Sequence, residues 1–387
     1  MKKTLLTLLS YILVAALAVT IALGVEAYLD QPQLSGSNKL QQLEELILEK
    51  FIGDADRIAM EDAAAEAMLG ALGDRWSYYI SAEDFTAYME QMNNAYVGIG
   101  VTIQVVEQGG FEIIQIAAGG SAEEAGFQLG DVIVAVDGQS VRDVEVSQCR
   151  NLVRGKEGTY VQITVERAGE EITFSVERRT VQTPVATGEM LENHVGLVTI
   201  VNFDARCYAE TKAAIESLLD QGATAIIFDL RYNPGGYKSE LVKLLDYVLP
   251  EGVLFRSEDY LGNISVDKSD ASCLDIPMAV LVNANTYSAA EFFAAALREY
   301  EVAVVVGEKT VGKGYFQNTY YLPDGSAVAL STGRYKTPMG VSLEGVGITP
   351  DIQVEVDEET AYYIYAGVLD PVEDPQILAA LDALKQQ

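Results

Sequence analysis

The sequence predicts a multidomain α+β protein in which a helical segment, a small and partly open β-domain and a larger α/β domain follow one another. Three observations carry this prediction. The chain has 387 residues, which is enough for two or three domains of ~100 to 200 residues each. A glycine-punctuated β pattern begins at residue 97, and strand and helix patterns alternate regularly after residue 195.

The N-terminal segment, residues 1–28, has the pattern of a membrane anchor. Residues 4–25 are uncharged and follow Lys2 and Lys3, and as a helix they would rise by about 33 Å, which is enough to cross a bilayer. We therefore expect a single-pass protein of the cell membrane whose functional part lies outside the cytoplasm. Residues 25–27 also resemble a cleavage site, so removal as a signal peptide, which gives a secreted or periplasmic protein, stays an alternative.

Residues 29–95 form the predicted helical N-terminal segment, because apolar residues recur at helical spacing. The β-domain is expected over residues 96–180 and contains short strand patterns and one helical pattern at 141–153. The strand patterns cover residues 97–103, 112–116, 131–136, 160–166 and 171–176.

The α/β domain is expected over residues 181–355, followed by a helical C-terminal segment at 356–387. Its strand and helix patterns alternate in the order of a βαβ-type sheet covered by helices. The strands are predicted at 196–201, 225–230, 278–282 and 303–306, and the helices at 209–221, 238–248 and 289–300.

Composition excludes several classes of function. There are 26 Lys and Arg against 57 Asp and Glu, so the formal charge of −31 would repel phosphate backbones, and nucleic acid is not an expected partner. The single histidine, His194, excludes a three-histidine metal site, and we assign it to a surface turn. The three cysteines are widely spaced and are expected to be small buried hydrophobes. We expect neither a metal nor a cofactor.

Ser288 lies where a predicted strand gives way to an apolar helix. There its oxygen would be exposed above a sheet edge, with the amide of Ala289 beside a developing oxyanion. The same residue also fits a capping box with Glu291, in which the hydroxyl only accepts a bond from a backbone amide. On the local sequence alone, the capping interpretation is favoured.

A nucleophilic serine needs a base, and Lys313 is the preferred candidate. An amine accepts a proton only when it is neutral, so a pKa that is ordinarily about 10.4 must be lowered by burial among apolar neighbours. The flanking glycines allow close packing, and Gln317 would orient the amine without stabilising its charged form. An exposed turn at residues 312–314 is the alternative.

The sequence DLRYNPGG at residues 229–236 follows a predicted strand. Its two adjacent glycines, Gly235 and Gly236, would turn successive amides toward one point and form an oxyanion hole. A phosphate-binding loop is disfavoured because the spacing GxxxxGK[ST] is absent. A plain turn entering a helix also fits these residues.

Taken together, these motifs resemble the carboxyl-terminal processing peptidases, the tail-specific S41 serine endopeptidases with a PDZ domain. The serine turn, the 25 residues that separate Ser288 from Lys313 and the DLRYNPGG motif all match that family. The PDZ-like segments are VGIGV at 97–101, GGSAEEAG at 119–126, GDVI at 130–133 and RGKEGT at 154–159, and the closing segments are GRYKTP at 333–338 and GVGITPDI at 345–352.

The resemblance implies a crotonase-like protease core and assigns roles to these residues. Ser288 would be the nucleophile, Lys313 the general base and Gln317 the residue that orients it. The amide of Ala289 and one amide of the Gly235–Gly236 pair would form the oxyanion hole, with the choice of glycine left open.

The PDZ-like domain suggests how substrates are selected. The C-terminus of a peptide would add a strand beside residues 99–103, with Gly98, Ile99, Gly100 and Val101 at the binding site. The expected partners are exported or membrane proteins with free C-termini, and a loaded domain would gate activity. A homodimer through the helical N- and C-terminal segments is also considered. The rival functions are a catalytically silent PDZ scaffold and a solute-binding α/β protein.

Overall fold

The computed structural model describes residues 39–106 and 108–386. These fall into two units that divide after Tyr79. In the first unit, α2 (Lys39–Lys50) and α3 (Arg57–Gly70) form a helical pair, in agreement with the predicted helical segment. Asp56 begins α3 by accepting a hydrogen bond from the Ala59 amide, and Arg57 pairs with Glu44 of α2 at 3.0 Å.

The prediction of a single-pass membrane protein requires a correction. Within the ranges given above, no helix has both the length and the apolar character needed to cross a bilayer. The expected anchor at residues 4–25 lies outside the described residues.

The second unit begins with the end of β1 (Tyr78–Ile80) and continues through α4 (Phe85–Met92) to a two-stranded stem. In this stem, β2 (Ala95–Gly98) pairs with β9 (Arg179–Gln182) in antiparallel register, Ala95 opposite Gln182. All of the small β-domain lies between these two strands in the sequence. Both chain connections of that domain therefore run through the stem.

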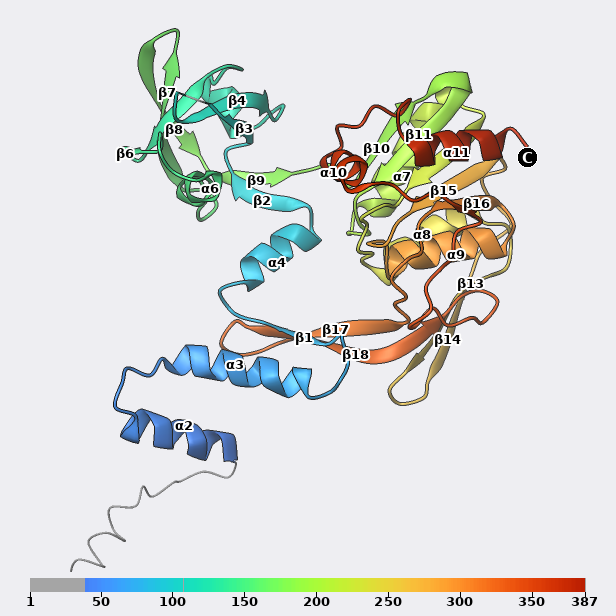
Figure 1. Ribbon diagram of the computed structural model, residues 1–387, viewed down its shortest axis with the longest axis horizontal. Coiled ribbons are helices and arrows are strands. Elements are labelled where there is room, and N and C mark those ends of the chain that lie inside the picture. The colour runs from blue at the N-terminus through green and yellow to red at the C-terminus, as the bar shows by residue number, and fades with distance from the viewer. Residues whose placement is uncertain (1–38, 107, 387) are drawn as a thin grey trace, which may run out of the picture. The chain divides into compact units, whose positions relative to one another are not determined.

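The small β-domain is a curved antiparallel sheet with two helices (Figure 1). Its strand order is β3-β4-β5-β7-β8, and β6 pairs with β5. Alternating apolar residues such as Ile113, Ile163 and Val165 are fully buried in its core. The elements are β3 (Val101–Val105), β4 (Phe111–Ile116), α5 (Ser121–Ala125), β5 (Val132–Val136), β6 (Gln139–Ser140), α6 (Val146–Val153), β7 (Tyr160–Arg167) and β8 (Glu170–Glu177).

The α/β domain is built on a six-stranded sheet of order β10-β11-β12-β15-β16-β19, parallel except for the edge strand β10. The strands are β10 (Ala186–Met190), β11 (Val195–Ile200), β12 (Ala225–Asp229), β15 (Met278–Val282), β16 (Ala303–Gly307) and β19 (Ile352–Gln353). A short helix η1 (Glu192–His194) precedes β11. The predicted βαβ alternation is thus present.

Helices cover both faces of this sheet. Ile226, Phe228 and Val280 point into the core shared with α7 (Cys207–Asp220), α8 (Lys238–Val248) and α9 (Ala289–Glu299). The alternate residues Ile227, Ala279 and Leu281 pack against α11 (Pro375–Leu384) on the opposite face. Because both faces are buried, the parallel strands are apolar at nearly every position. Figure 1 shows α11 on one side of the sheet, with α8 and α9 on the other.

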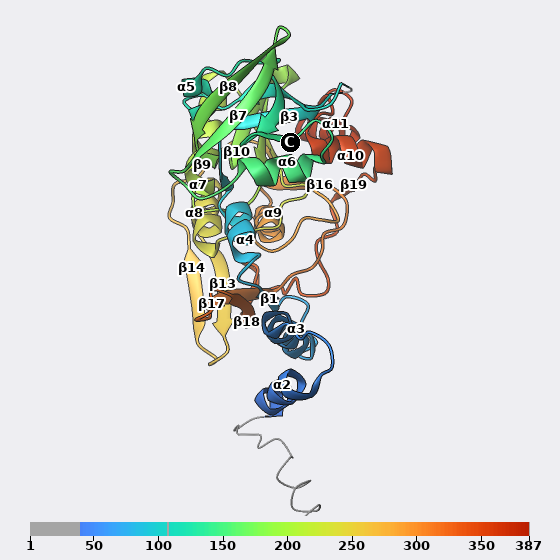
Figure 2. The same cartoon turned by 90° about the vertical axis from the view of Figure 1, so that its left-hand side faces the viewer.

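A second antiparallel sheet was not predicted. It contains β13 (Val253–Asp259), β14 (Ile264–Lys268), β17 (Tyr315–Tyr321) and β18 (Ala327–Lys336), and β13 and β14 form the hairpin seen in Figure 2. The sequences FRSED and ISVDK within β13 and β14 are largely polar and partly exposed, so they lack the apolar runs that identify buried strands. Helix α10 (Glu358–Ala366) precedes α11, as the helical pattern of the C-terminal segment predicts.

Candidate active site

Ser288 occupies a strained turn between β15 and α9. Its backbone has φ 60 and ψ −127, a conformation that L-residues rarely adopt, and its side chain makes no capping hydrogen bond to α9. The turn is held by Thr286, whose buried hydroxyl donates to the Leu230 carbonyl at 2.8 Å and accepts from the Asn283 amide at 3.0 Å. The capping-box interpretation is therefore wrong, and the hydroxyl is presented at the end of the sheet.

Glu291 bonds to residues 310–313 and does not form the capping box expected with Ser288. Its buried carboxylate accepts hydrogen bonds from the Thr310 hydroxyl, from the Gly312 amide at 2.8 Å and from the Lys313 amide at 2.9 Å. Burial raises the pKa of Glu291, while these donors oppose the shift. The residue three positions after Ser288 thus fixes the backbone of the segment that carries Lys313.

Lys313 is half-buried and lies close to the turn that contains Ser288. Its Nζ is 5.8 Å from the centroid of the Tyr287 ring, within the range of a cation–π contact. The expected alternative, an exposed turn at residues 312–314, does not fit this placement, because Gly312 and Gly314 are both buried. The Gln317 amide nitrogen donates to the Ser331 hydroxyl at 3.0 Å and to the Tyr315 carbonyl at 3.3 Å.

Tyr335 of β18 is a further residue of the site, which the sequence did not predict. Its phenol is buried and donates to the main-chain carbonyl of Lys313. Burial raises the pKa of the phenol, Glu291 raises it further, and a hydrogen bond with the Ser288 side chain opposes the shift. Tyr335 therefore stays protonated and lies between the serine side chain and the lysine backbone. The only signal in the sequence was its place in the GRYKTP segment.

The DLRYNPGG segment at residues 229–236, called the glycine loop below, packs directly against Ser288. A Cβ added to Gly235 would lie 2.7 Å from the Ala289 nitrogen and 3.0 Å from the Ser288 Oγ, so only glycine fits there. The Gly235 amide donates to the Asn233 Oδ1 at 2.8 Å. In the described part of the chain, the Gly236 amide has no such acceptor. These contacts bring the loop, the serine and the first amide of α9 to one place.

A buried ion network fixes the start of the glycine loop. The Arg231 guanidinium contacts Asp229 at 2.5 Å and Asp374 at 2.7 Å, and all three side chains are at most 11% exposed. Asp374 begins α11 by accepting hydrogen bonds from the Gln376 and Ile377 amides. The network therefore links the end of β12 to the C-terminal helix. Since a guanidinium with two carboxylates is well compensated, it can stay charged while buried.

The candidate peptide-binding residues of the small β-domain lie at one edge of its sheet. β3 is an edge strand of that sheet and follows Gly98, Ile99 and Gly100 directly. The Ile99 carbonyl accepts from the Ala122 amide at 3.0 Å and the Gly100 carbonyl from the Ala117 amide at 2.8 Å. These bonds anchor the glycine segment, and β3 offers an edge to which an extended peptide can pair.

The remaining candidates lie apart from this site. His194 is exposed in η1, which confirms the surface-turn interpretation. Cys149 and Cys207 are buried as expected, whereas Cys273 is exposed, so the prediction of a buried residue was wrong for Cys273. The residues before it, at 270–272, are polar or small and are also exposed.

Comparisons with known proteins agree with this geometry. Residues 194–354 match the model of peptidase family S41, and residues 97–177 match that of the PDZ domain. The carboxy-terminal processing protease CtpA of Bacillus subtilis is 31% identical over 365 residues, covering 92% of this chain and 78% of that protein. The carboxyl-terminal-processing protease of a Synechocystis species is 31% identical over 348 residues, covering 88% of this chain and 80% of that protein.

A solved structure described as an S41 protease from Bacteroides fragilis shares the fold. It superimposes with a TM-score of 0.53 at 17% identity, covering 92% of this chain and 99% of that one. The crotonase-like relationship expected for the core stays a prediction. The chain belongs to the carboxyl-terminal processing proteases of peptidase family S41, which makes it a serine protease with a PDZ domain.

Proposed function

We propose that this protein cleaves polypeptides near their C-termini through a Ser288–Lys313 dyad. The proposal rests above all on the strained backbone of Ser288, whose hydroxyl makes no capping hydrogen bond. This backbone presents the hydroxyl between the glycine loop and the segment that contains Lys313. Strain at a functional residue persists only where the surrounding structure enforces it. Here Thr286, Gly235 and the start of α9 provide that enforcement.

In the proposed reaction, the neutral Lys313 amine takes the proton of the Ser288 hydroxyl as the Oγ atom attacks the scissile carbonyl carbon. The tetrahedral intermediate then collapses, the C–N bond breaks, and the Lys313 ammonium returns the proton to the leaving amine. Water attacks the resulting acyl-enzyme by the same route, and Ser288 is regenerated. Gln317 would orient the lysine in its neutral form.

For the oxyanion hole we favour the amides of Ala289 and Gly236. The Gly235 amide is already engaged by Asn233, whereas Ala289 is the first residue of α9 and its amide has no partner within the helix. Two donors aimed at the developing charge are the usual arrangement for acyl transfer, and the loss of one lowers kcat by about 10²- to 10³-fold.

The PDZ domain would bind the C-terminus of the substrate. An extended peptide would pair with β3, while its carboxylate meets the amides of residues 98–101. Such binding holds the chain near the protease domain and raises the local concentration of the scissile bond. Loading of the domain would also gate the active site.

The decisive experiment compares two peptides that differ only in a free or an amidated C-terminus. We expect the wild-type protein to cleave the free peptide faster, and Ser288→Ala and Lys313→Ala to cleave neither. Lys309→Ala is the matched control, because Lys309 is an exposed lysine four residues upstream. Full activity of Ser288→Ala would refute the dyad and favour a catalytically silent scaffold, while equal cleavage of both peptides would remove only the recognition of tails.

The homodimer stays a prediction. Helix α2 has no buried residue and exposes Leu40, Leu43 and Leu46, which supports a covered apolar surface in the first unit. Light scattering on the full chain would give twice the mass of 41.9 kDa if the proposal holds.

A further inference from the structure

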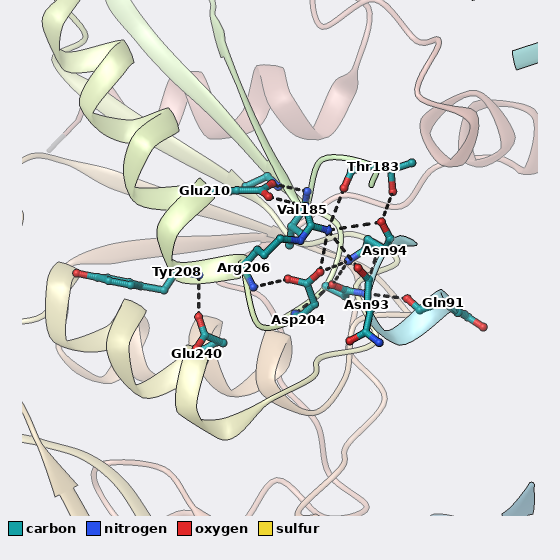
Figure 3. A network of polar contacts seen from close by, with 12 residues as sticks. Gln91, Asn93, Asn94, Thr183, Val185, Asp204, Arg206, Tyr208, Glu210 and Glu240 are labelled. Atoms are coloured by element: carbon teal, nitrogen blue, oxygen red, sulfur yellow. Dashed lines mark hydrogen bonds and ion pairs between the residues drawn. The ribbon is translucent and has the colours of Figure 1, made fainter. Parts of the chain in front are cut away.

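One polar network fastens the base of the PDZ stem to the protease domain (Figure 3). At its centre, the Arg206 Nη2 donates to the carbonyls of Asn93 at 3.2 Å and Thr183 at 3.1 Å, and contacts the Asp204 carboxylate at 3.0 Å. Its Nη1 pairs with Glu210 at 2.6 Å. Because Asn93 precedes β2 and Thr183 follows β9, a single guanidinium holds both connections of the PDZ domain.

Asn94, the residue just before the stem, belongs to the same network. Its side-chain Nδ2 donates to the Asn202 Oδ1 at 2.6 Å and to the Asp204 Oδ2 at 3.0 Å. Its main-chain carbonyl accepts from the Thr183 main-chain amide at 2.9 Å, which joins the two connections to each other. The backbone of Asn94 has φ 45, a left-handed conformation that asparagine tolerates better than most residues.

The two side chains that accept the Asn94 hydrogen bonds, Asn202 and Asp204, are both buried. The Asp204 side chain is 1% exposed and receives donors on both oxygens, the second from the Arg206 amide at 2.7 Å. Leaving a buried carboxylate without its partners is costly. Glu210 accepts from the Val185 amide at 2.6 Å and thus holds the chain that leaves the stem. Several hydrogen bonds thus connect the stem to residues 202–206 and Glu210.

Residues 202–206 also hold the glycine loop of the active site. Phe203 lies between Asn202 and Asp204, donates its amide to the Gly235 carbonyl at 2.8 Å and accepts from the Tyr237 amide at 2.7 Å. The two backbones pack closely here, because a Cβ added to Gly236 would lie 2.3 Å from the Phe203 carbonyl oxygen. In so close a packing, a displacement of Phe203 would shift the Gly236 amide as well.

We propose that Asn94 and Arg206 are positioning residues that set the Gly236 amide in the oxyanion hole and so couple the seating of the PDZ stem to catalysis. The inference rests on the proposed function, since it requires Gly236 to be an oxyanion donor. It goes beyond that function in naming the side chains through which the stem acts. Neither residue touches the substrate.

The test uses two variants of the full chain. Asn94→Gly removes the side-chain bonds to Asn202 and Asp204 but accepts the left-handed backbone, and Arg206→Lys keeps the charge but loses the planar set of donors. The matched controls are Ala168→Gly, a left-handed position in the β7–β8 turn with φ 53, and Arg142→Lys, whose guanidinium contacts Glu166 at 2.7 Å within the PDZ domain.

The readout is inhibition by a peptidyl aldehyde with the sequence of the assay peptide. Its adduct with Ser288 places an oxygen in the oxyanion hole, so its affinity reports the Gly236 amide, whereas KM reports ground-state binding of the peptide. We expect both variants to bind the aldehyde about 10- to 100-fold more weakly, which is part of the loss seen when a whole donor is removed, with KM within about twofold of wild type. The controls should match wild type.

A merely structural role would give another pattern. The variants would then have a lower melting temperature and fewer active sites by titration, but unchanged aldehyde affinity and kcat for each active site, and this result would overturn the inference. Ser288→Ala separates it from the proposed function. If that variant keeps the aldehyde affinity of wild type, the proposed function fails. If it loses this affinity while Asn94→Gly and Arg206→Lys retain theirs, only the inference fails.

Discussion

Replacing Gly235 by alanine tests whether the glycine loop and Ser288 form one catalytic unit. The new Cβ would lie 2.7 Å from both the Ala289 nitrogen and the Ser288 Cβ, while ordinary contact begins at 3.4 Å. The serine turn must therefore retreat by about 0.7 Å, and a displacement of ~1 Å at a reacting group typically costs about 10²-fold in rate. We expect kcat/KM to fall by about 30- to 100-fold, or ~2 to 3 kcal/mol of transition-state stabilisation.

Gly262→Ala is a closely matched control. Gly262 has φ +84 against φ +87 for Gly235, and a Cβ there would meet nothing within 4 Å. Both variants therefore bear the left-handed backbone cost of about 1 to 2 kcal/mol, and only Gly235→Ala adds overpacking of ~1 to 3 kcal/mol. Peptide hydrolysis per titrated active site and urea unfolding measure the two effects. If the Gly235→Ala enzyme keeps kcat/KM within threefold of Gly262→Ala, the glycine loop does not position Ser288 for catalysis.

Three further predictions concern single side chains. Tyr335→Phe removes the hydrogen bond to the Lys313 carbonyl and should lower stability by about 1 kcal/mol and kcat about tenfold, and unchanged hydrolysis would contradict this role. Burial raises the pKa of the Cys207 thiol to about 12 and that of the Cys149 thiol to about 11, whereas Cys273 is exposed. Iodoacetamide at pH 8 should therefore label only Cys273 in the folded chain, and all three thiols in urea. The pKa of Glu291 is raised in the folded state above its ordinary value of 4.5, so the folded state keeps this proton to a higher pH than the unfolded state. The stability of the wild type relative to Glu291→Gln should therefore fall as the pH rises above about 4.5. A difference in urea unfolding that does not change with pH would argue against this.

Local patterns predicted the elements that bury continuous apolar surface. The parallel strands β11, β12, β15 and β16 and the helices between them agree with their predicted positions to within a few residues. The strands are short runs of mostly apolar residues, and the helices carry apolar residues at helical spacing. The antiparallel strands β13 and β17 were not predicted, because they are partly polar. Both pair with β18, which follows β13 much later in the chain and follows β17 after a turn.

The same distinction holds for the active site. Ser288, Lys313 and the glycine pair each stand in a short recognisable motif, so they could be named before the fold was known. Glu291 was assigned to a capping box because the local pattern fits one, yet its carboxylate bonds a segment about 20 residues away. Arg206 gave no local signal, because its acceptors belong to segments that only the fold brings together.

Covalent labelling tests the Ser288–Lys313 dyad most directly. Treatment with a fluorophosphonate, followed by peptide mass mapping, reports whether a serine is activated and which one. We expect a single adduct on Ser288 in the wild-type protein and in Lys309→Ala, and none in a folded Lys313→Ala variant. An adduct on another serine, or undiminished labelling of Ser288 without the lysine, would contradict it.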